Sequence, residues 1–450
     1  MKRVASLAAV VGLILVVTGF RPPSIDSRPE LHTELKESTP ARDTTLATPL
    51  ETVVLVFSEP VEPKLSSIRW FGPAGDTLSL EVSAPDDQPE VLIASAPPAA
   101  DGPQRLEWRT VSVDGHQVSG TIPFTVRLSA PAGREAGAGP DSVAGSGESA
   151  PGAREEPETR PVAPSTARLA VGGIGMLCLL GFAGLLWFGM GTTILDEPRT
   201  HRLTSVLGLG ATVLLALDAV LWLAQVRVPG TDLAGTLSAV LDTRSGAVVA
   251  AQVALAALAF LVFTGTHAVR FGAFVGMLAV VVGALGGHQA SIDPLISLPA
   301  NGLHLGAAAV WTGGILLLGI WPSRIEPGQP GPDVGWTFPR IALRVSSAAL
   351  LASTTILVTG VVQDVLYLPS IGALFSSTYG YLLLAKTGGF LALVGFGAYN
   401  KFRLIPALVA ETHGEAGPTP LRRSVRLELI VVVVVVLVAV ALAQVPPPVG

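Results

Sequence analysis

Residues 427–445 read LELIVVVVVVLVAVALAQV, an apolar run with a single charged residue near its start. A helix that crosses the hydrocarbon core of a bilayer needs about 20 residues of this kind. The composition of the whole chain agrees, because 49% of its 450 residues are hydrophobic and only 14% are charged. An average soluble domain has about 25% charged residues. The sequence therefore predicts a membrane protein.

Seven more apolar stretches precede this one, and together they predict an all-α membrane domain of eight transmembrane helices over residues 169–450. The eight stretches are residues 169–194, 203–226, 246–266, 271–289, 303–322, 344–366, 379–399 and 427–445. Lys and Arg test the orientation, because connections rich in them stay on the cytoplasmic side. Eleven such residues fall on the side assigned to the cytoplasm, and two, Arg227 and Arg244, fall on the other. We therefore expect the C-terminus to lie outside.

The part of the chain before residue 169 has a different chemistry. Residues 21–168 carry 13 Lys or Arg and 22 Asp or Glu, a net charge of −9, whereas residues 169–450 have a net charge of +2. Residues 1–20 have the layout of a secretory signal, with Lys2 and Arg3 ahead of an apolar run, which predicts a cleaved signal peptide or a signal anchor. We therefore expect a multi-pass protein of the bacterial plasma membrane whose acidic N-terminal domain lies outside.

Residues 21–129 show short apolar segments separated by Pro, Gly and Asp. Leu106, Trp108 and Thr110 alternate with charged residues, which is the period of a strand with one buried face. Six strands are predicted, at residues 52–58, 66–71, 77–83, 90–95, 104–112 and 121–128. This pattern indicates an all-β sandwich of the immunoglobulin-like or cupredoxin-like kind. Residues 130–168, rich in Pro, Gly, Ala and Glu, predict a disordered linker.

Composition also excludes several classes of protein. The single cysteine, Cys178, excludes a disulfide framework and a Cys-based zinc or iron–sulfur site held by this chain alone. A net charge of −5 leaves no basic footprint for a nucleic acid. The sequence shows no ATPase motif, and we expect a protein that is not an enzyme.

The most specific candidate site in the acidic domain is Asp114-Gly115-His116. A turn of this kind presents a carboxylate and an imidazole close together, a pair that suits a divalent metal such as Cu(II). Asp-Gly is also an ordinary hairpin turn, so the residues alone leave both interpretations open.

In the membrane domain, His288 ends the predicted fourth helix and His304 begins the fifth. The predicted topology puts both imidazoles at the outer surface, where they are candidate copper ligands or, alternatively, helix caps. Asp218 and Lys386 fall inside the hydrocarbon layer at matching depths. Ionisable groups there are costly and often functional, and we expect the two to form an intramembrane pair.

Several segments resemble known copper proteins. Residues 31–41 (LHTELKESTPA), 57–63 (FSEPVEP) and 108–126 are similar to the CopC family of periplasmic copper-binding proteins. That family holds Cu(II) with an N-terminal His and the Asp and His of an Asp-Gly-His turn. The resemblance therefore implies His32, Asp114 and His116 as copper ligands.

The membrane domain resembles CopD, the membrane partner of that family. The similar segments are residues 287–290 (GHQA), 303–314 (LHLGAAAVWTGG), 338–343 (FPRIAL), 379–386 (YGYLLLAK) and 422–428 (RRSVRLE). The whole chain is similar to a CopC–CopD fusion, a family associated with copper import and copper resistance. The resemblance implies capture of Cu(II) outside and passage of copper, as Cu(I) or Cu(II), through the membrane domain. The alternatives are a haem-binding redox membrane protein and a copper sensor or scaffold that does not transport.

Overall fold

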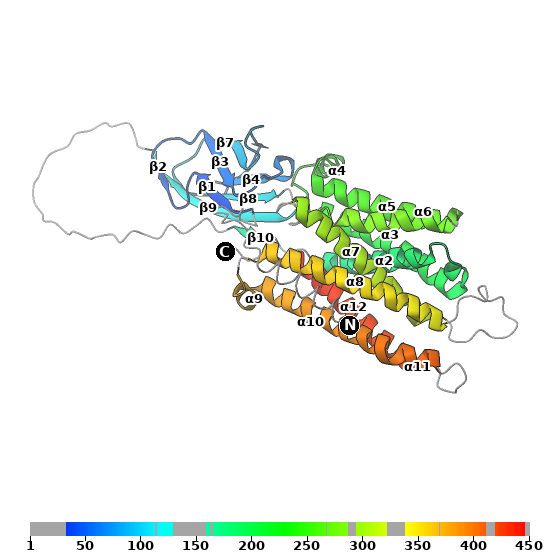
Figure 1. The fold of residues 1–450 in the computed structure, drawn as a ribbon. Coiled ribbons are helices and arrows are strands. Elements are labelled where there is room, and N and C mark those ends of the chain that lie inside the picture. The colour runs from blue at the N-terminus through cyan, green and yellow to red at the C-terminus, as the bar shows by residue number, and fades with distance from the viewer. Residues whose placement is uncertain are drawn as a thin grey trace, which may run out of the picture. The chain divides into compact units, whose positions relative to one another are not determined.

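A computed structural model describes residues 33–112, 115–128, 159–162, 165–266, 268–286, 294–321, 338–368, 370–410 and 419–445. The chain divides into two compact units. A β-rich unit comprises His32–Ala163 and Gln225–Thr243, and a helical unit contains the rest of the chain. Both are drawn in Figure 1.

The β-rich unit is a sandwich of two sheets. Its described strands are β1 (Leu35–Thr39), β2 (Thr45–Leu46), β3 (Thr52–Phe57), β4 (Ser67–Phe71), β5 (Thr77–Leu80), β6 (Val82–Ser83), β7 (Val91–Ser95), β8 (Gly102–Val111), β9 (Gln117–Val126) and β10 (Arg160–Pro161). One sheet has the order β1-β3-β7-β6, and the other has the order β10-β9-β8-β4-β5, with β2 paired to β9. The long β8–β9 hairpin, which runs in register from Gly102 opposite Val126 to Val111 opposite Gln117, forms the centre of the second sheet.

Alternating apolar residues on both sheets fill the space between them. Leu55, Ile68, Leu106 and Ile122 are fully buried there, and Trp108 packs edge-on against the ring of Phe57 from the opposite sheet. Each large apolar side chain buried in this way stabilises the fold by about 1.5–3 kcal/mol. The sandwich predicted from the alternating pattern is thus confirmed.

A short helix, α4 (Leu233–Leu241), belongs to the β-rich unit. The Asp232 side chain caps its start by accepting a hydrogen bond from the Gly235 amide. Just after the end of α4, Asp242 accepts a 2.8 Å hydrogen bond from Lys64. Lys64 is the middle residue of a 3-10 turn at Pro63–Leu65. This hydrogen bond raises the pKa of Lys64, while burial raises the pKa of the nearby Glu62 carboxyl.

The helical unit is built from long apolar helices. They are α2 (Thr166–Gly189), α3 (Pro198–Val226), α5 (Arg244–Thr266), α6 (Val269–Gly283), α7 (Pro294–Ile320), α8 (Phe338–Tyr367), α10 (Thr378–Tyr399) and α12 (Thr419–Leu442). The short elements between them are η2 (Ile194–Asp196), α9 (Ala373–Ser376), the π-helix η4 (Asn400–Leu404) and α11 (Ile405–Ala410). Among the described residues, seven helices are long and apolar enough to cross a membrane, and α6, with 15 residues, is a shorter apolar helix.

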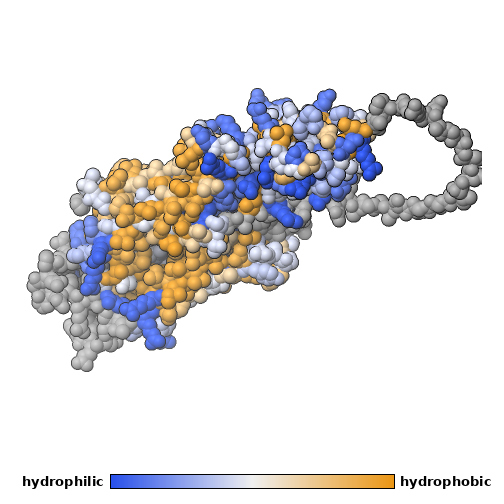
Figure 2. Space-filling model, turned by 180° about the vertical axis from the view of Figure 1, so that it is seen from behind, coloured by the Kyte–Doolittle hydropathy of each residue, from blue (hydrophilic) through white to orange (hydrophobic). Residues whose placement is uncertain are grey.

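The outside of the helical unit is apolar. Large hydrophobic side chains that are more than half exposed occur on nearly every long helix, among them Val206, Leu261, Phe274, Leu351, Leu391 and Val434. Figure 2 shows hydrophobic residues covering this unit and hydrophilic residues gathered over the β-rich unit. An exposed apolar surface of this extent needs lipid around it, so the chain is a multi-pass membrane protein.

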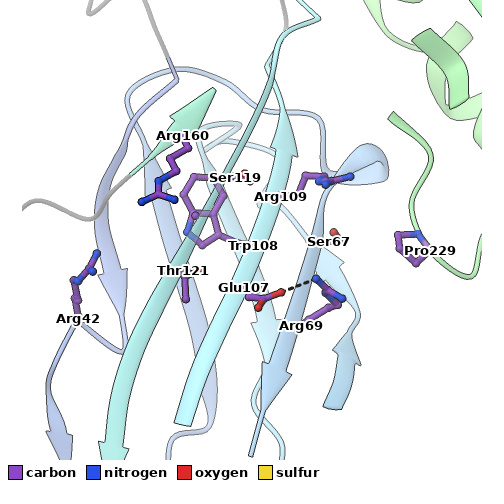
Figure 3. Close-up of a pocket in the computed structure, with 11 residues that line it drawn as sticks. Arg42, Ser67, Arg69, Glu107, Trp108, Arg109, Ser119, Thr121, Arg160 and Pro229 are labelled. Carbon is purple, nitrogen blue, oxygen red and sulfur yellow. Dashed lines mark hydrogen bonds and ion pairs between the residues drawn. The ribbon is translucent and has the colours of Figure 1, made fainter. Parts of the chain in front are cut away.

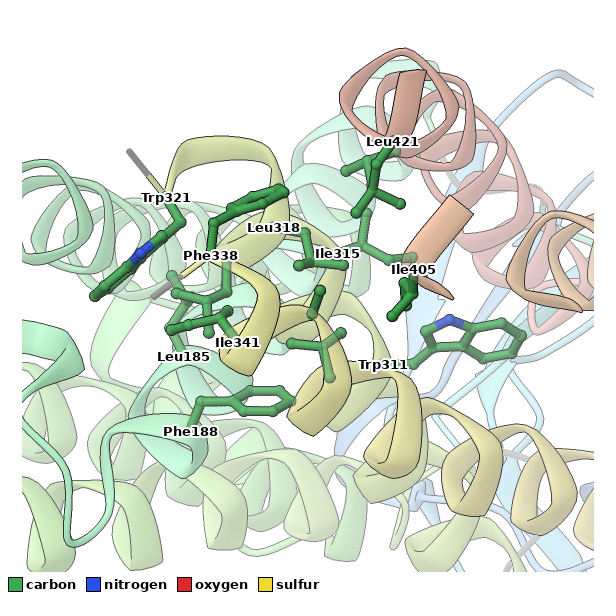
Figure 4. Close-up of a cluster of buried hydrophobic side chains, with 14 of the residues drawn as sticks. Leu185, Phe188, Trp311, Ile315, Leu318, Trp321, Phe338, Ile341, Ile405 and Leu421 are labelled. Carbon is green, nitrogen blue, oxygen red and sulfur yellow. The ribbon is translucent and has the colours of Figure 1, made fainter. Parts of the chain in front are cut away.

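Inside the bundle, aromatic and aliphatic side chains of α2, α7, α8 and α12 form the largest core. Phe188, Ile315, Trp321 and Ile341 are almost completely buried in it (Figure 4). Helices α2 and α7 approach closely at Gly184 and Gly313, where a Cβ atom on either glycine would collide with the backbone of the other helix. Small residues at such a crossing let two backbones pack directly in a membrane.

The structure refines several boundaries expected from the sequence. It adds the short strands β1, β2 and β10, and α2 begins at Thr166, before the predicted boundary at residue 169. The linker predicted over residues 130–168 is not wholly unstructured, because β10 lies within it and pairs with β9. Residues 1–20, the predicted signal segment, lie outside the described residues.

Candidate functional site

The turn that joins β8 to β9 presents His116, which is half-buried. The His116 carbonyl accepts hydrogen bonds from the Ser112 amide (2.9 Å) and the Ser112 hydroxyl (3.1 Å). Gly115 has φ +88°, a conformation that favours glycine. These bonds hold the His116 carbonyl against Ser112. Asp114, the second residue of the candidate pair, lies outside the described residues.

The start of β1 lies at the same end of the sandwich as this turn. Leu35 pairs with Phe57 at the end of β3, and Val61, four residues further on, forms an isolated bridge with Ser112. The Glu34 amide donates a hydrogen bond of 2.9 Å to the Ser58 hydroxyl. The chain thus enters the sandwich next to the turn that carries His116. His32 itself lies outside the described residues, which begin at residue 33.

A cavity of about 290 Å³ lies within the helical unit. It occupies the half of the bundle that contains the starts of α2, α7 and α10 and the ends of α8 and α12. Its polar or soft lining residues are Met176, Asn301, His304, Gln363, Asp364, Tyr367, Tyr379 and Lys386. A membrane-embedded cavity with this many polar groups is the main candidate site of the helical unit.

The hydrogen bonds of His304 determine which ring nitrogen is available. Its Nδ1 lies 2.9 Å from the Thr359 hydroxyl, and that hydroxyl donates its only proton to the Thr355 carbonyl at 2.7 Å. With the hydroxyl proton on the Thr355 carbonyl, Thr359 accepts from an Nδ1–H group. In the neutral imidazole this leaves the lone pair on Nε2, the arrangement of a histidine oriented for metal binding.

The structure corrects the expected start of the helix that carries His304. The sequence placed it at the first turn of its helix and at the membrane edge, but α7 begins at Pro294, so ten residues, or about 15 Å of helix, precede His304. The prediction was wrong because the polar segment around Ser297, Pro299 and Asn301 continues the helix although it does not look like membrane sequence. His288, its predicted partner, lies outside the described residues.

The predicted pair of Asp218 and Lys386 is not formed. Asp218 instead pairs with Arg168 of α2, with Nε and Oδ1 3.4 Å apart. Lys386 lines the cavity and interacts electrostatically with Asp364 of α8. Equal depth did not make the two predicted groups partners, because the rotation of each helix about its axis decides which neighbour a side chain faces.

Sequence reasoning missed Asp364, although it lies inside the predicted 344–366 span and could have been found by searching each span for charges. It also missed that Met176 and His304 line one cavity. Cys178, two positions after Met176, faces elsewhere: a Cβ atom on Gly210 of α3 would lie 3.1 Å from its sulfur. His201 stacks near Phe263, with ring centroids 4.9 Å apart, and takes no part in the cavity lining.

Comparisons with known protein families match parts of both units of the chain. The CopC domain model matches residues 35–127, and the model for copper resistance protein D matches residues 339–442. The chain is 33% identical over 104 residues to copper resistance protein C of Escherichia coli, which make up 21% of this chain and 82% of that protein. The chain belongs to the CopC/CopD family.

A further relative and a solved structure match different lengths of this chain. Copper transport protein CutJ of Bacillus subtilis (strain 168) is 26% identical over 391 residues, which make up 82% of this chain and 67% of CutJ. A crystal structure of CopC from Methylosinus trichosporium OB3b is 30% identical, with 22% of this chain and 99% of that chain covered and a TM-score of 0.22. The domain matches and the similarity to copper resistance protein C make copper handling the function of the family to which this chain belongs.

The copper resistance protein D match covers α8, α10 and α12 and therefore includes Thr359, Asp364 and Lys386, whereas His304 and Met176 lie before it. The match also includes a second polar cluster in the opposite half of the bundle. There the Asn400 amide, at the start of the π-helix, donates a hydrogen bond to the buried Glu428 carboxylate. Both residues line a cavity of about 170 Å³. The CopD-like region thus has polar groups in both halves of the bundle.

Proposed function

We propose that this protein captures Cu(II) on the outer side of a bacterial plasma membrane and passes copper inward through its helical unit. The outer ligands in this proposal are His32, Asp114 and His116. The observation that carries the inner part is the imidazole of His304, whose Nδ1 is engaged by Thr359 while Nε2 is left with its lone pair.

The chemistry of the membrane cavity supports copper as the cargo. An imidazole accepts either oxidation state of copper, and a thioether is a soft ligand that suits Cu(I). His304 and Met176 line the same cavity, so we propose that it holds copper, as Cu(I) when an external one-electron reductant has first reduced the captured Cu(II). His288 is proposed as a further ligand at the outer entrance.

Two charged side chains supply the electrostatics of this proposal. The Asp364 carboxylate attracts a cation into an otherwise apolar bundle, and the Lys386 ammonium compensates that carboxylate while no copper is bound. A copper ion that enters the cavity takes over part of the role of Lys386 in balancing the negative charge of Asp364. In the opposite half of the bundle, the Glu428 carboxylate is the next anionic group on the way to the other side.

The orientation in this proposal comes from the distribution of positive charge. Connections rich in Lys and Arg remain in the cytoplasm, which puts the β-rich unit and the C-terminus outside. The cavity around His304 then belongs to the outer half of the bundle and the cluster around Glu428 to the inner half.

Copper uptake into liposomes tests the proposal. Purified protein is reconstituted with a copper indicator trapped inside, and the initial rate is measured after addition of copper outside. We expect His304→Ala to lower the rate at least about tenfold, since it removes a direct ligand. His201→Ala is the matched control and should transport normally. An unchanged rate in His304→Ala would refute the assigned pathway, and copper binding without uptake by the unaltered protein would identify a scaffold.

A further inference from the structure

A groove of about 530 Å³ lies on the outer face of the second sheet of the sandwich. Its charged lining residues are Arg42, Arg69, Arg109, Arg160 and Glu107. Figure 3 shows the four arginine side chains arranged around the indole of Trp108, with Arg42 and Arg160 on one side and Arg69 and Arg109 on the other. They come from four different places in the chain, namely the β1–β2 loop, β4, β8 and β10.

The lining contains one carboxylate, that of Glu107, for four guanidinium groups. Glu107 binds Arg69 at 2.5 Å and also contacts Arg105, outside the groove, at 3.3 Å. The Nε atom of Arg42 is buried and has no hydrogen-bond partner among the described residues, although it forms a 3.7 Å ion pair with Asp43. Guanidinium groups gathered around one hollow repel each other unless an anion lies between them.

The paired strands β8 and β9 form the floor of the groove, where Glu107 lies opposite Thr121 and Arg109 opposite Ser119. A Cβ atom on Gly120 of β9 would lie 2.6 Å from the indole of Trp108 in the neighbouring strand β8. Both residues therefore face the interior of the sandwich, where Trp108 is 3% exposed and packs against Phe57. The hydroxyl groups of Ser67, Ser119 and Thr121 complete the lining. The result is a groove whose lining is rich in hydrogen-bond donors.

The four arginines stand out against the composition of the region around them. Residues 21–168 have a net charge of −9, yet four arginines line one hollow in this acidic region. Arginine forks match the geometry of carboxylate and phosphate groups, which they bind through two parallel hydrogen bonds. We propose that this groove is a binding site for a small anion that carries two or more carboxylate or phosphate groups. The site is independent of the copper ligands, since its lining does not include His116.

Calorimetric titration of the full chain in maltoside detergent, which carries no anionic group, tests this site. Citrate and inorganic phosphate are the probes, and no copper is added. We expect saturable binding of citrate that weakens as salt is raised. Arg109→Gln should lower the affinity about tenfold, because it removes a hydrogen bond between charged groups. Arg42→Gln should do the same. Arg127→Gln, which removes the same charge outside the groove, is the matched control and should bind as the unaltered protein does.

The source of the anion is decided by repeating the titration with added phosphatidylglycerol. Competition with citrate that is lost in Arg109→Gln identifies a lipid headgroup as a ligand of the groove, while an unchanged citrate affinity identifies a soluble anion. The proposal is overturned if neither probe binds at 10 mM, or if Arg109→Gln, Arg42→Gln and Arg127→Gln all bind citrate equally. Thermal melting of each variant confirms that the sandwich is folded.

Discussion

The turn around His116 and the cavity around His304 place histidines in opposite settings. His116 is half-buried, lies between two strands, and its carbonyl accepts hydrogen bonds from Ser112. The cavity is enclosed by long helices, its histidine is bonded to a second helix, and two opposite charges line it with that histidine. A metal ligand on a loop exchanges readily with solvent, whereas one in the bilayer needs partners that orient it and balance its charge.

This contrast matches the two tasks of a copper-handling protein. Capture from solution favours a site that is open to water and ready before copper arrives. Passage through a membrane favours weaker sites in sequence, none of which holds the ion so tightly that it cannot leave. The following experiments each change one side of the comparison, in order of decreasing expected effect.

The largest effect is expected from the charges in the cavity. Lys386→Met leaves the Asp364 carboxylate without its cation, and removing one partner of a buried pair costs about 3–5 kcal/mol. We expect this loss in the free energy of unfolding of the helical unit in mixed detergent. The double variant Lys386→Met/Asp364→Asn should recover most of it. Equal stability of Lys386→Met and the unaltered protein would show that the two charges do not compensate each other.

A direct ligand of the outer site should come next. We expect His116→Ala to weaken Cu(II) binding by the full chain about 100-fold or more, since even groups that only orient a ligand cost 10–100-fold when removed. The measurement is a titration against a competing chelator. His201→Ala should bind normally. An equal Cu(II) affinity in His116→Ala would remove the turn from the site.

The orienting hydroxyl in the cavity should have a smaller effect. Thr359→Val removes the acceptor that holds Nδ1 of His304, and we expect copper affinity of the cavity to fall about 10–100-fold. The His116→Ala background isolates this binding from the outer site. Thr354→Val is the matched control, because its hydroxyl donates only to the Leu350 carbonyl. Identical affinities in the two threonine variants would contradict the proposed role of Thr359.

The smallest effect concerns the sandwich alone. Burial raises the pKa of Glu62, so the folded state holds that proton more tightly than the unfolded state does. This contribution to stability is present at low pH and is lost as the pH rises through the folded pKa. Glu62→Gln should therefore be more stable than the unaltered protein at pH 7, within about 0.5 kcal/mol. The advantage should shrink at pH 4. A lower melting temperature for Glu62→Gln at pH 7 would show that the carboxylate is stabilising instead.

Hydropathy and alternation were sufficient to predict the two units, because both are set by local sequence. All eight apolar stretches correspond to helices, and the strands at residues 52–58, 66–71 and 90–95 differ from β3, β4 and β7 by one residue at most. These features depend on which residues face lipid, water or a core, and composition records that directly.

The pairings between helices could not be predicted in the same way. Arg168 was assigned to the linker and so was not considered as a partner of Asp218, which it contacts. Thr359 reads as one of several polar residues in an apolar helix, and only packing shows that it faces His304. Such contacts depend on the rotation of one helix against another, which a single sequence does not specify.

The glycine crossing of α2 and α7 has a mechanical consequence for the cavity. Met176 lies eight residues before Gly184 on α2, and His304 lies nine residues before Gly313 on α7. The crossing fixes the separation of α2 and α7, because their backbones are in direct contact and no side chain between them can change its conformation. Any opening of the cavity must then come from its other walls, α8, α10 and α12. We therefore expect Met176 and His304 to keep their positions when the cavity opens and the helices that carry Asp364 and Lys386 to move.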